Sequence, residues 1–360
     1  MSEACRANHQ HSPGGARPGA TDPARNGGGM TAGLNVVVLD QHLTRFRSQF
    51  QAALPADATA SFPDPADEQA VRDALREAQV VVTGAFTPER AALAKDLRLL
   101  HVSGGGLDQI DTTALPSGTQ VCNTFHHEDS IAEYTVAAAV LLRRDFAAQD
   151  AALRQGEWLC PAFRADVPYG RALTGATVGF VGFGHIGRRA WELFRTFRAR
   201  GVAVTRSGDI DAVAAGLDWA GTIADLDHLL AAADVVVLSA PLTPQTAGLI
   251  GTPQLHAMRA SAVLVNVSRG GLVDPEALAE ALRDNEIAGA AIDVWWNYPA
   301  DGSHADPTPF PLPEGANVLM TPHSSGLTEQ TFIGRIADIC GNIARLGFGR
   351  PLTNVVAVTR

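Results

Sequence analysis

Residues 177–187 read TVGFVGFGHIG, an apolar run that ends in Gly182, Gly184 and Gly187 and then continues into a helical pattern. The first glycine permits a tight turn, the second lets the backbone approach a ligand, and the third lets helix and strand pack closely. The free N–H groups at the start of a helix attract an anion. The stretch therefore predicts a dinucleotide pyrophosphate site, the alternative being an ordinary turn between a strand and a helix. The predicted apolar face of the helix consists of Ile186, Ala190, Leu193, Phe194 and Phe197.

The composition is that of a globular protein with a sizeable core, since 46% of the 360 residues are hydrophobic and 18% are charged. The length is sufficient for two domains. The net charge of −10 argues against nucleic acid or an anionic membrane as the main partner. No run approaches the ~20 apolar residues of a membrane span, and the N-terminus lacks the apolar core of a signal peptide.

The cysteines indicate a reducing compartment. Their spacing matches neither a zinc site nor a disulfide framework. We therefore expect the chain to work in the cytoplasm. The residues concerned are Cys5, Cys122, Cys160 and Cys340.

Beyond residues 1–33, which we expect to be disordered and within which Met30 is a candidate start, apolar strand-like runs alternate with helical patterns. One helix start is clear: Asp274 as N-cap, Pro275 at the first position and Glu276 in the first turn. Such alternation predicts doubly wound, parallel α/β sheets. The predicted strands are Asn35–Leu39, Val80–Thr83, Leu99–Ser103, Thr177–Val181, Val202–Thr205, Val235–Ser239, Val263–Val267, Ala288–Val294 and Val318–Thr321.

Two long helical stretches, Ser130–Glu157 and Thr328–Leu346, interrupt this alternation. Long helices of this kind join one domain to another, and the glycine turn lies between them in the chain. We therefore expect a nucleotide domain at residues 136–323, inserted into an outer domain made of residues 34–135 and 324–360.

Polar residues follow three of the apolar strands, at the sheet edge where α/β proteins bind ligands. Arg269, in NVSRGG, is suited to hold a carboxylate bidentately, the alternative being a surface arginine. His323, in TPHSSG, is a candidate proton donor, or else a histidine satisfied within its loop. Asp293, in AIDV, is equally compatible with capping a turn and with binding a cofactor amide.

Several motifs occur in the order found in D-2-hydroxyacid dehydrogenases, and the chain resembles that family over residues 35–356. The resemblance implies a Rossmann nucleotide-binding domain inserted into a discontinuous, flavodoxin-like substrate domain, and a homodimer. The matching motifs are GGGLD at 104–108, IAE at 131–133, GFGHIG at 182–187, NVSRG at 266–270, IDV at 292–294, TPH at 321–323 and GRPLTNVV at 349–356.

The resemblance also implies an activity, namely hydride transfer between a nicotinamide cofactor and a small D-2-hydroxy or 2-keto acid such as glyoxylate or hydroxypyruvate. Arg269 would bind the substrate carboxylate and polarise the C2 oxygen. His323 would donate or accept the proton at that oxygen. The N–H groups around Gly105 and Gly106 would bind the same carboxylate.

The cofactor contacts are implied in the same way. Asp293 would hold the nicotinamide carboxamide, and His185 and Ile186 would lie along the pyrophosphate beside Gly182, Gly184 and Gly187. The remaining expected cofactor residues are Pro241 on the adenosine side, Thr246 and Val267.

The chain departs from the family where a glutamate normally pairs with the catalytic histidine, because that position holds Tyr298. We expect the Tyr298 hydroxyl to orient the imidazole through a neutral hydrogen bond, so that the pKa of His323 stays near the ordinary ~6.5. A carboxylate from Asp301, Asp306 or Glu314 is the alternative source of charge.

A second departure concerns the choice between NAD and NADP. An NAD site has an acidic residue at the end of its second strand, whereas this chain has Thr205 and Arg206 there. Arginine without a neighbouring acid suits a 2′-phosphate, which favours NADP. Alternatively, Asp209 or Asp211 reaches the ribose and the cofactor is NAD.

His126, His127 and Glu128 lack the spacing of a metal site, so we expect no metal there and expect the histidines to shape the cleft.

Two competing functions remain. Formate dehydrogenases also lack the glutamate and share Asp293-Val-Trp, although they have glutamine where this chain has Tyr298. The second competing function is that of a nucleotide-sensing regulator without turnover. It is suggested by the replacement of the glutamate that normally pairs with the catalytic histidine.

Overall fold

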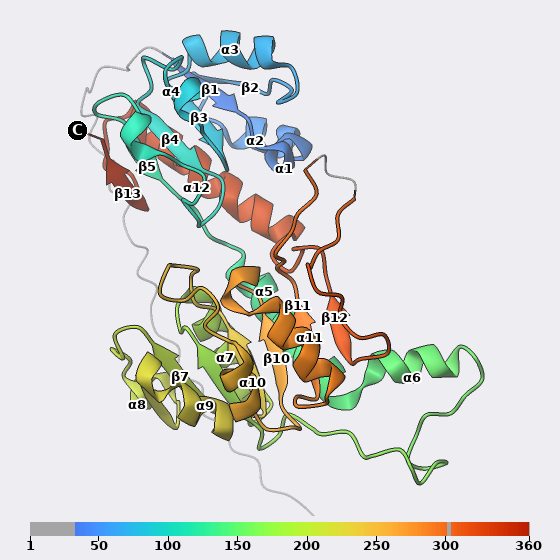
Figure 1. The fold of residues 1–360 in the computed structure, drawn as a ribbon. Coiled ribbons are helices and arrows are strands. Elements are labelled where there is room, and N and C mark those ends of the chain that lie inside the picture. Colours follow the sequence, from blue (N-terminus) through green and yellow to red (C-terminus); the bar gives the residue numbers. More distant parts are fainter. Residues whose placement is uncertain (1–32, 301–303, 360) are drawn as a thin grey trace, which may run out of the picture.

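A computed structural model of the chain describes residues 33–300 and 304–359. Apart from Gly33, the segment expected to be disordered lies outside these residues, as do Met30 and Asp301. The described residues form two lobes, each built on its own sheet (Figure 1). The chain passes between the lobes just before α5 (Glu128–Arg144) and again just before α12 (Glu329–Gly347).

The sheet of the first lobe has the order β13-β5-β4-β3-β1-β2. Its strands are parallel except for β13, which pairs antiparallel with β5 at the edge. The strand order reverses between β1 and β3. In a sheet of this kind, a ligand site is expected at the point where the strand order reverses. The strands are β1 (Leu34–Val38), β2 (Ala58–Ser61), β3 (Val80–Thr83), β4 (Leu99–Val102), β5 (Gln120–Cys122) and β13 (Val355–Val358).

The second lobe contains a fully parallel sheet in the order β12-β11-β10-β9-β6-β7-β8. Its order reverses between β6 and β9, as in a dinucleotide-binding fold. The two parallel-sheet α/β units expected from the sequence are therefore present. The strands are β6 (Thr177–Val181), β7 (Arg200–Thr205), β8 (Trp219–Thr222), β9 (Val235–Leu238), β10 (Val263–Asn266), β11 (Gly289–Ile292) and β12 (Val318–Met320).

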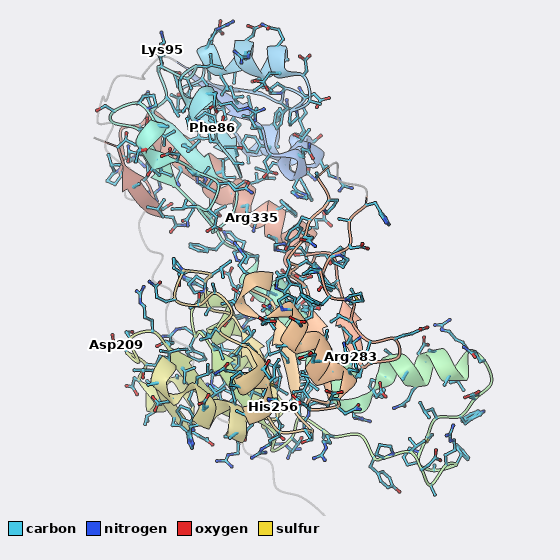
Figure 2. All side chains as sticks on the ribbon, viewed as in Figure 1. Phe86, Lys95, Asp209, His256, Arg283 and Arg335 are labelled. Carbon is cyan, nitrogen blue, oxygen red and sulfur yellow. The ribbon has the colours of Figure 1, made fainter. Side chains whose placement is uncertain are left out.

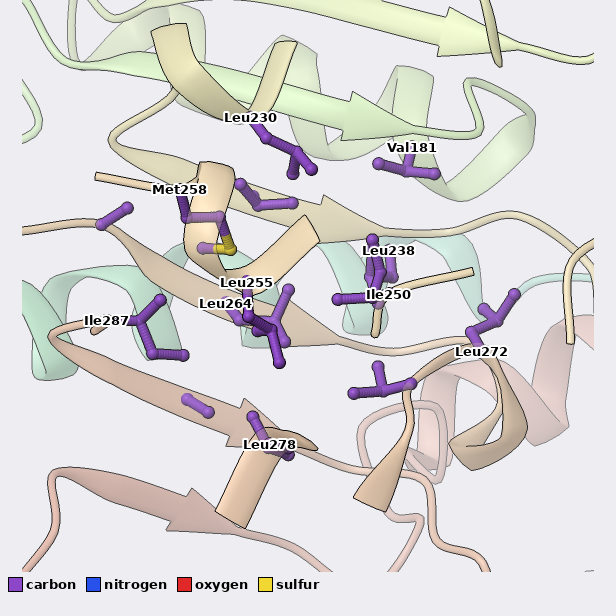
Figure 3. Packing of buried hydrophobic residues seen from close by; sticks show 14 of the residues in the cluster. Val181, Leu230, Leu238, Ile250, Leu255, Met258, Leu264, Leu272, Leu278 and Ile287 are labelled. Carbon is purple, nitrogen blue, oxygen red and sulfur yellow. The ribbon is translucent and has the colours of Figure 1, made fainter. Parts of the chain in front are cut away.

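Helices cover both faces of each sheet, so the central strands are apolar on both sides. Every residue of β3, β9 and β10 is buried. In the second lobe, leucine and isoleucine side chains from strands and helices interlock on one face, among them Leu238, Leu264 and Leu278 (Figure 3). This packing fixes the strand ends that carry the polar residues.

The remaining helices are as follows. The first lobe contains α1 (Gln41–Arg45), α2 (Arg47–Ala53), α3 (Glu68–Arg76), α4 (Pro88–Ala91) and the 3-10 turn η1 (Thr112–Ala114). The others are α6 (Phe146–Leu153), α7 (His185–Thr196), α8 (Ala212–Ala215), η2 (Ile223–Asp225), α9 (Leu226–Ala232), α10 (Thr252–Ala257), η3 (Gly270–Leu272) and α11 (Pro275–Arg283).

The prediction of one long helix over Ser130–Glu157 is wrong. Asp145 adopts a left-handed conformation with φ of 50°, which ends α5 and starts α6. By contrast, α12 forms at the predicted place with Thr328 as its N-cap, and Asp274 caps α11 as expected. In α7, Ala190 and Phe194 are buried, whereas Phe197 lies beyond the helix and is 44% exposed.

Within the described residues, no helix combines the length and apolar character needed to cross a membrane.

Candidate functional site

The glycine turn after β6 is as tight as its sequence predicts. Gly182 has φ of 89°, and a Cβ there would lie 2.5 Å from the backbone nitrogen of Ala240 after β9. A Cβ on Gly187 would lie 2.9 Å from the carbonyl oxygen of Gly182. Neither position can hold a side chain without moving the backbone, so both glycines are needed for the fold itself.

Gly184 is different, because the space beside it is open. No atom lies within 4 Å of the position that its Cβ would take. Gly184 is also the N-cap of α7, and no side chain caps the helix. Free N–H groups, a helix dipole and open space together fit a pyrophosphate, which His185 and Ile186 would flank in the first turn.

The end of β7 offers a cation and no free acid in the position expected for the ribose. Arg206 is exposed and makes no ion pair or hydrogen bond with the described residues. The Thr205 hydroxyl accepts a hydrogen bond from the Gly208 N–H at 3.0 Å. The Asp211 carboxylate caps α8 by accepting a hydrogen bond from the Ala214 N–H. Asp211 is one of the two acids that could bind the ribose hydroxyls, and this cap engages it.

Three more expected cofactor residues lie after β9 and β10. The Thr246 hydroxyl donates to the carbonyl oxygen of Pro241 at 2.8 Å, which braces the loop that follows β9. Val267 directly follows β10 and is buried. These loops lie beside the glycine turn, because the Ser239 hydroxyl donates to the carbonyl oxygen of Gly182 at 2.8 Å.

The polar residues predicted to carry chemistry follow three adjacent strands. Arg269 comes after β10, Asp293 after β11 and His323 after β12, and these strands are neighbours in the sheet. Arg269 is close enough to His323 to lower its pKa. The parallel sheet thus gathers residues that are 54 positions apart in the sequence (269 to 323).

Tyr298 contacts His323 as the sequence analysis expected. The Tyr298 hydroxyl lies 2.9 Å from Nδ1 of His323, and the Trp295 N–H donates to the same hydroxyl at 3.1 Å. The hydroxyl can donate its proton to an unprotonated Nδ1, and its second lone pair can accept from a protonated Nδ1. Tyr298 therefore contacts the ring through Nδ1 and leaves Nε2 on the opposite side.

Asp293 holds the loop that carries His323. Its carboxylate is fully buried and accepts hydrogen bonds from the Thr321 hydroxyl at 2.7 Å, from the Ser324 N–H at 2.9 Å and from both groups of Ser325. This network accounts for the positive φ of 58° at His323, because it fixes the backbone on both sides of that residue. A contact of Asp293 with the nicotinamide stays a prediction.

The pKa of His323 lies below the ordinary value that the sequence analysis expected. Burial of the imidazole is the main cause, the Asp293 carboxylate acts in the opposite direction, and the Arg269 guanidinium reinforces the decrease. Asp306 and Glu314 are not among the groups that shift this pKa. The Tyr298 hydroxyl therefore faces the ring, and neither Asp306 nor Glu314 replaces the missing glutamate, whereas Asp301 lies outside the described residues.

Arg269 bridges the two lobes. Its Nη1 donates to the carbonyl oxygen of Ser268 at 2.8 Å, and its Nη2 forms an ion pair with the Asp108 carboxylate of the first lobe at 3.1 Å. A Cβ on Gly106 would lie 3.3 Å from the same Nη2. The guanidinium thus lies against the glycine loop that follows β4.

That loop presents backbone donors to the cleft. The N–H groups of Gly105 and Gly106 have no acceptor among the described residues. The loop is held from behind, because Asn123 Nδ2 donates to the carbonyl oxygen of Gly105 at 3.0 Å and the Thr124 N–H donates to that of Gly104 at 3.3 Å. A carboxylate placed here would meet two N–H groups and the guanidinium of Arg269.

The structure adds cleft residues that the sequence analysis did not single out. The Phe125 ring stacks on His185 of the glycine turn with ring centroids 4.8 Å apart, so the lobes touch beside this turn. Of the paired histidines, His126 bonds to Asp338 at 2.9 Å and His127 contacts Arg335, both on α12. Arg335 carries no sequence signal, because an arginine within a helix is usually a solvated one.

Comparison with known proteins points to one family. Residues 136–325 match the family described as D-isomer specific 2-hydroxyacid dehydrogenase, NAD binding domain. A glyoxylate reductase of Aeropyrum pernix is 32% identical over 267 residues, which are 73% of this chain and 77% of that protein. A D-3-phosphoglycerate dehydrogenase of Archaeoglobus fulgidus is 29% identical over 293 residues, covering 80% of this chain and 53% of that protein.

The chain thus spans about half the length of the D-3-phosphoglycerate dehydrogenases that it matches. Among solved structures, a D-isomer specific 2-hydroxyacid dehydrogenase of Lactobacillus delbrueckii, in its NAD-complexed form, superposes with a TM-score of 0.71. The match covers 89% of this chain and 99% of that chain at 23% identity, which supports the fold.

Proposed function

The chain belongs to the D-isomer specific 2-hydroxyacid dehydrogenase family, and on this premise we propose that it interconverts a small 2-keto acid and its D-2-hydroxy acid with NAD(P). One observation carries the proposal. Arg269 lies against Gly106 and is close enough to His323 to lower its pKa, so these two side chains lie together with the unpaired N–H groups of Gly105 and Gly106, and the Phe125–His185 stack brings the glycine turn to the same lobe junction.

The residues divide the work as their chemistry suggests. The substrate carboxylate binds the N–H groups of Gly105 and Gly106 and the guanidinium of Arg269, which leaves its pairing with Asp108. Arg269 also polarises the C2 oxygen. His323 gives its Nε2 proton to that oxygen during reduction and takes it back during oxidation, while Tyr298 keeps the ring oriented through Nδ1. The bound nicotinamide supplies or accepts the hydride.

For the cofactor we propose NADP in preference to NAD. Arg206 has no partner among the described residues and is suited to a 2′-phosphate. Asp211 is occupied as a helix cap, which leaves Asp209 as the acid that could serve NAD. Titration calorimetry with NADPH and NADH tests this: NADPH should bind more tightly, and Arg206→Gln should remove the difference.

We further propose that the protein is a homodimer. After α5, residues 145–172 project from the second lobe as an arm, with α6 at its base (Figure 1). The arm exposes large apolar side chains, which a partner would cover. Light scattering should give twice the chain mass, and a monomer would contradict the proposal. The exposed side chains are Leu153, Trp158, Phe163 and Tyr169.

Substrate turnover tests the central proposal. Glyoxylate, hydroxypyruvate and pyruvate are offered with NADPH or NADH, and formate with NADP or NAD, while nicotinamide absorbance is followed. We expect oxidation of the reduced cofactor by at least one 2-keto acid and no reaction with formate. Turnover of formate alone would support a formate-type enzyme, and tight cofactor binding without any turnover would support a regulator.

A further inference from the structure

Arg335 lies at the junction of the two lobes, on α12 (Figure 2). Its Nε donates to the carbonyl oxygen of Phe125 at 3.0 Å, and its Nη2 lies 3.3 Å from Nδ1 of His127. A Cβ on Gly104 would lie 3.9 Å from that Nη2. The guanidinium therefore faces the same glycine loop that Arg269 contacts.

Among the residues that the structure describes, the charge of Arg335 has no direct counterion. Asp40 and Glu128 favour the charged form, yet no carboxylate among the described residues forms a salt bridge with the guanidinium. Asp40 is engaged elsewhere, by the Ser103 hydroxyl and the Leu43 N–H. Burial lowers the pKa of Arg335, which reflects the loss of part of its water shell. A partly desolvated, unpaired cation beside a cleft is stabilised by an anionic ligand.

His127 lies at the same place. Its Nδ1 is 3.3 Å from Nη2 of Arg335, and the ring also forms a hydrogen bond to the backbone of Phe125. Burial lowers the pKa of His127, which keeps the ring neutral near neutral pH. The ring lies against Gly105, whose Cβ would be 3.5 Å from Cε1. The imidazole thus contacts both the guanidinium of Arg335 and the glycine loop.

The two arginines are placed at opposite ends of one short segment. Arg335 lies next to Gly104, whereas Arg269 lies next to Gly106. Two residues of chain span at most about 7 Å. This limit applies to the two glycines, and each guanidinium lies within 4 Å of the Cβ position of its own glycine. A substrate with two anionic groups joined by a short carbon chain would place one group at each arginine, whereas a monocarboxylic acid such as pyruvate would reach only one.

We propose that Arg335, beside His127, forms a second anion subsite, so that the preferred substrate is a 2-keto or 2-hydroxy acid carrying a second anionic group. The inference rests on the proposed function, since Arg269 must bind the first carboxylate. The second group is a carboxylate or a phosphate, which share the chemistry that an arginine fork recognises.

The test compares kcat/KM for doubly and singly charged substrates. Oxaloacetate and 2-oxoglutarate represent the second carboxylate, 3-phosphohydroxypyruvate represents the phosphate, and pyruvate is the reference. We expect the best dianion to exceed pyruvate by at least about tenfold, because a charged hydrogen bond contributes this much or more. Which dianion is preferred identifies the second group.

Variants then connect the preference to Arg335. Arg335→Gln should lower kcat/KM for the dianion by about 10- to 100-fold and leave that for pyruvate essentially unchanged. Arg335→Lys keeps the positive charge but lacks the planar guanidinium. Its kcat/KM for the dianion should lie between that of the natural chain and that of Arg335→Gln. Arg345→Gln, at the far end of α12, is the matched control and should resemble the natural chain.

Two results would overturn the inference while leaving the proposed function intact: pyruvate preferred over every dianion, or Arg335→Gln lowering both kcat/KM values equally. Turnover of pyruvate also shows that each variant is folded. Absence of turnover with every 2-keto acid would instead contradict the proposed function, and the inference with it.

Discussion

At the scale of single residues, Tyr298 is the most unusual feature of the site. Its hydroxyl can donate to Nδ1 of His323 when that nitrogen is unprotonated and accept from it when it is protonated, because the phenol oxygen has a second lone pair beside the one used by Trp295. A glutamate could only accept. Tyr298 thus orients the ring in both protonation states. Unlike a glutamate, it adds no negative charge that would stabilise the imidazolium.

This predicts an acid-shifted pH profile for reduction. Reduction requires protonated His323, so the rate falls as the pH rises through the pKa of this residue, which burial keeps below its ordinary value. Tyr298→Glu adds a carboxylate that favours the imidazolium. The pH at which the reduction rate falls should therefore rise by about 1–3 units. Phe348→Glu, at an exposed position outside the arm, serves as the control. If the Tyr298→Glu profile matches that of the natural chain, Tyr298 does not set this pKa.

The contact between Tyr298 and His323 could be predicted from the sequence, because the resemblance named both positions. The pairing of Arg269 with Asp108 and the position of Arg335 could not. Both depend on how closely the lobes approach, and no local pattern in the sequence reports that distance. The pKa of His323 likewise depends on burial, which only the folded loop determines.

At the scale of elements, two glycines of one turn have different expected roles: Gly182 is needed for folding, and Gly184 leaves space for a ligand. Gly182 has a positive φ and no room for a Cβ, whereas Gly184 has φ of −84° and open space beside it. The two substitutions to alanine therefore form a matched pair within one turn.

Gly182→Ala should lower the free energy of unfolding by more than about 1 kcal/mol, through backbone strain and the clash with Ala240. Gly184→Ala should change it by less than about 0.5 kcal/mol and weaken cofactor binding on the order of tenfold, because its methyl group takes the space of the pyrophosphate. Chemical denaturation and calorimetry measure the two effects. Unchanged cofactor binding in Gly184→Ala would place the pyrophosphate elsewhere.

A second prediction at this scale concerns β4. His101 is fully buried there; Nδ1 lies 3.1 Å from the carbonyl oxygen of Val102, and Asn342 Nδ2 lies 3.1 Å from Nε2. The Thr353 N–H donates to Oδ1 of Asn342, so the amide presents its NH₂ to the ring, and a protonated Nε2 would face a donor. Burial accordingly lowers the pKa of His101 to about 4.

Because the unfolded chain binds this proton more readily than the folded one, the stabilisation is complete above pH ~6.5 and is lost as the pH falls towards 4. The loss amounts to roughly 3 kcal/mol. Denaturation across this pH range should show a slope to which His127 and His323 also contribute, because burial lowers their pKa values too, and His101→Gln should reduce that slope by the part that His101 supplies. His256→Gln, at an exposed position, should keep the slope. Equal slopes in all three proteins would contradict the assignment to His101.

The central elements could be predicted because continuous apolar runs are typical of buried parallel strands. Four strands were not predicted: β2, β5, β8 and β13. β2 and β8 read ATAS and WAGT, short edge segments that are only partly buried, and β5 has three residues. β13 is mostly exposed and pairs antiparallel, so it lacks the pattern of the others. The break at Asp145 was missed because no glycine or proline marks it.

At the scale of the whole molecule, the two sheets direct their carboxyl ends to one cleft. One lobe contributes the glycine loop, Arg335 and His127, and the other contributes Arg269, His323 and the turn for the pyrophosphate. The Phe125–His185 stack and the Arg269–Asp108 pair already connect the lobes. The substrate carboxylate would take the place of Asp108, which couples binding to the approach of the lobes.

The central claim is that Arg269 clamps a carboxylate whose neighbouring carbonyl receives a hydride and the proton of His323. The most direct measurement is the rate of NAD(P)H oxidation by the preferred 2-keto acid in the natural chain and in Arg269→Gln, with cofactor affinity measured alongside. We expect kcat/KM to be lower by about 100- to 1,000-fold in Arg269→Gln, with the cofactor still bound. An unchanged kcat/KM in Arg269→Gln would contradict it.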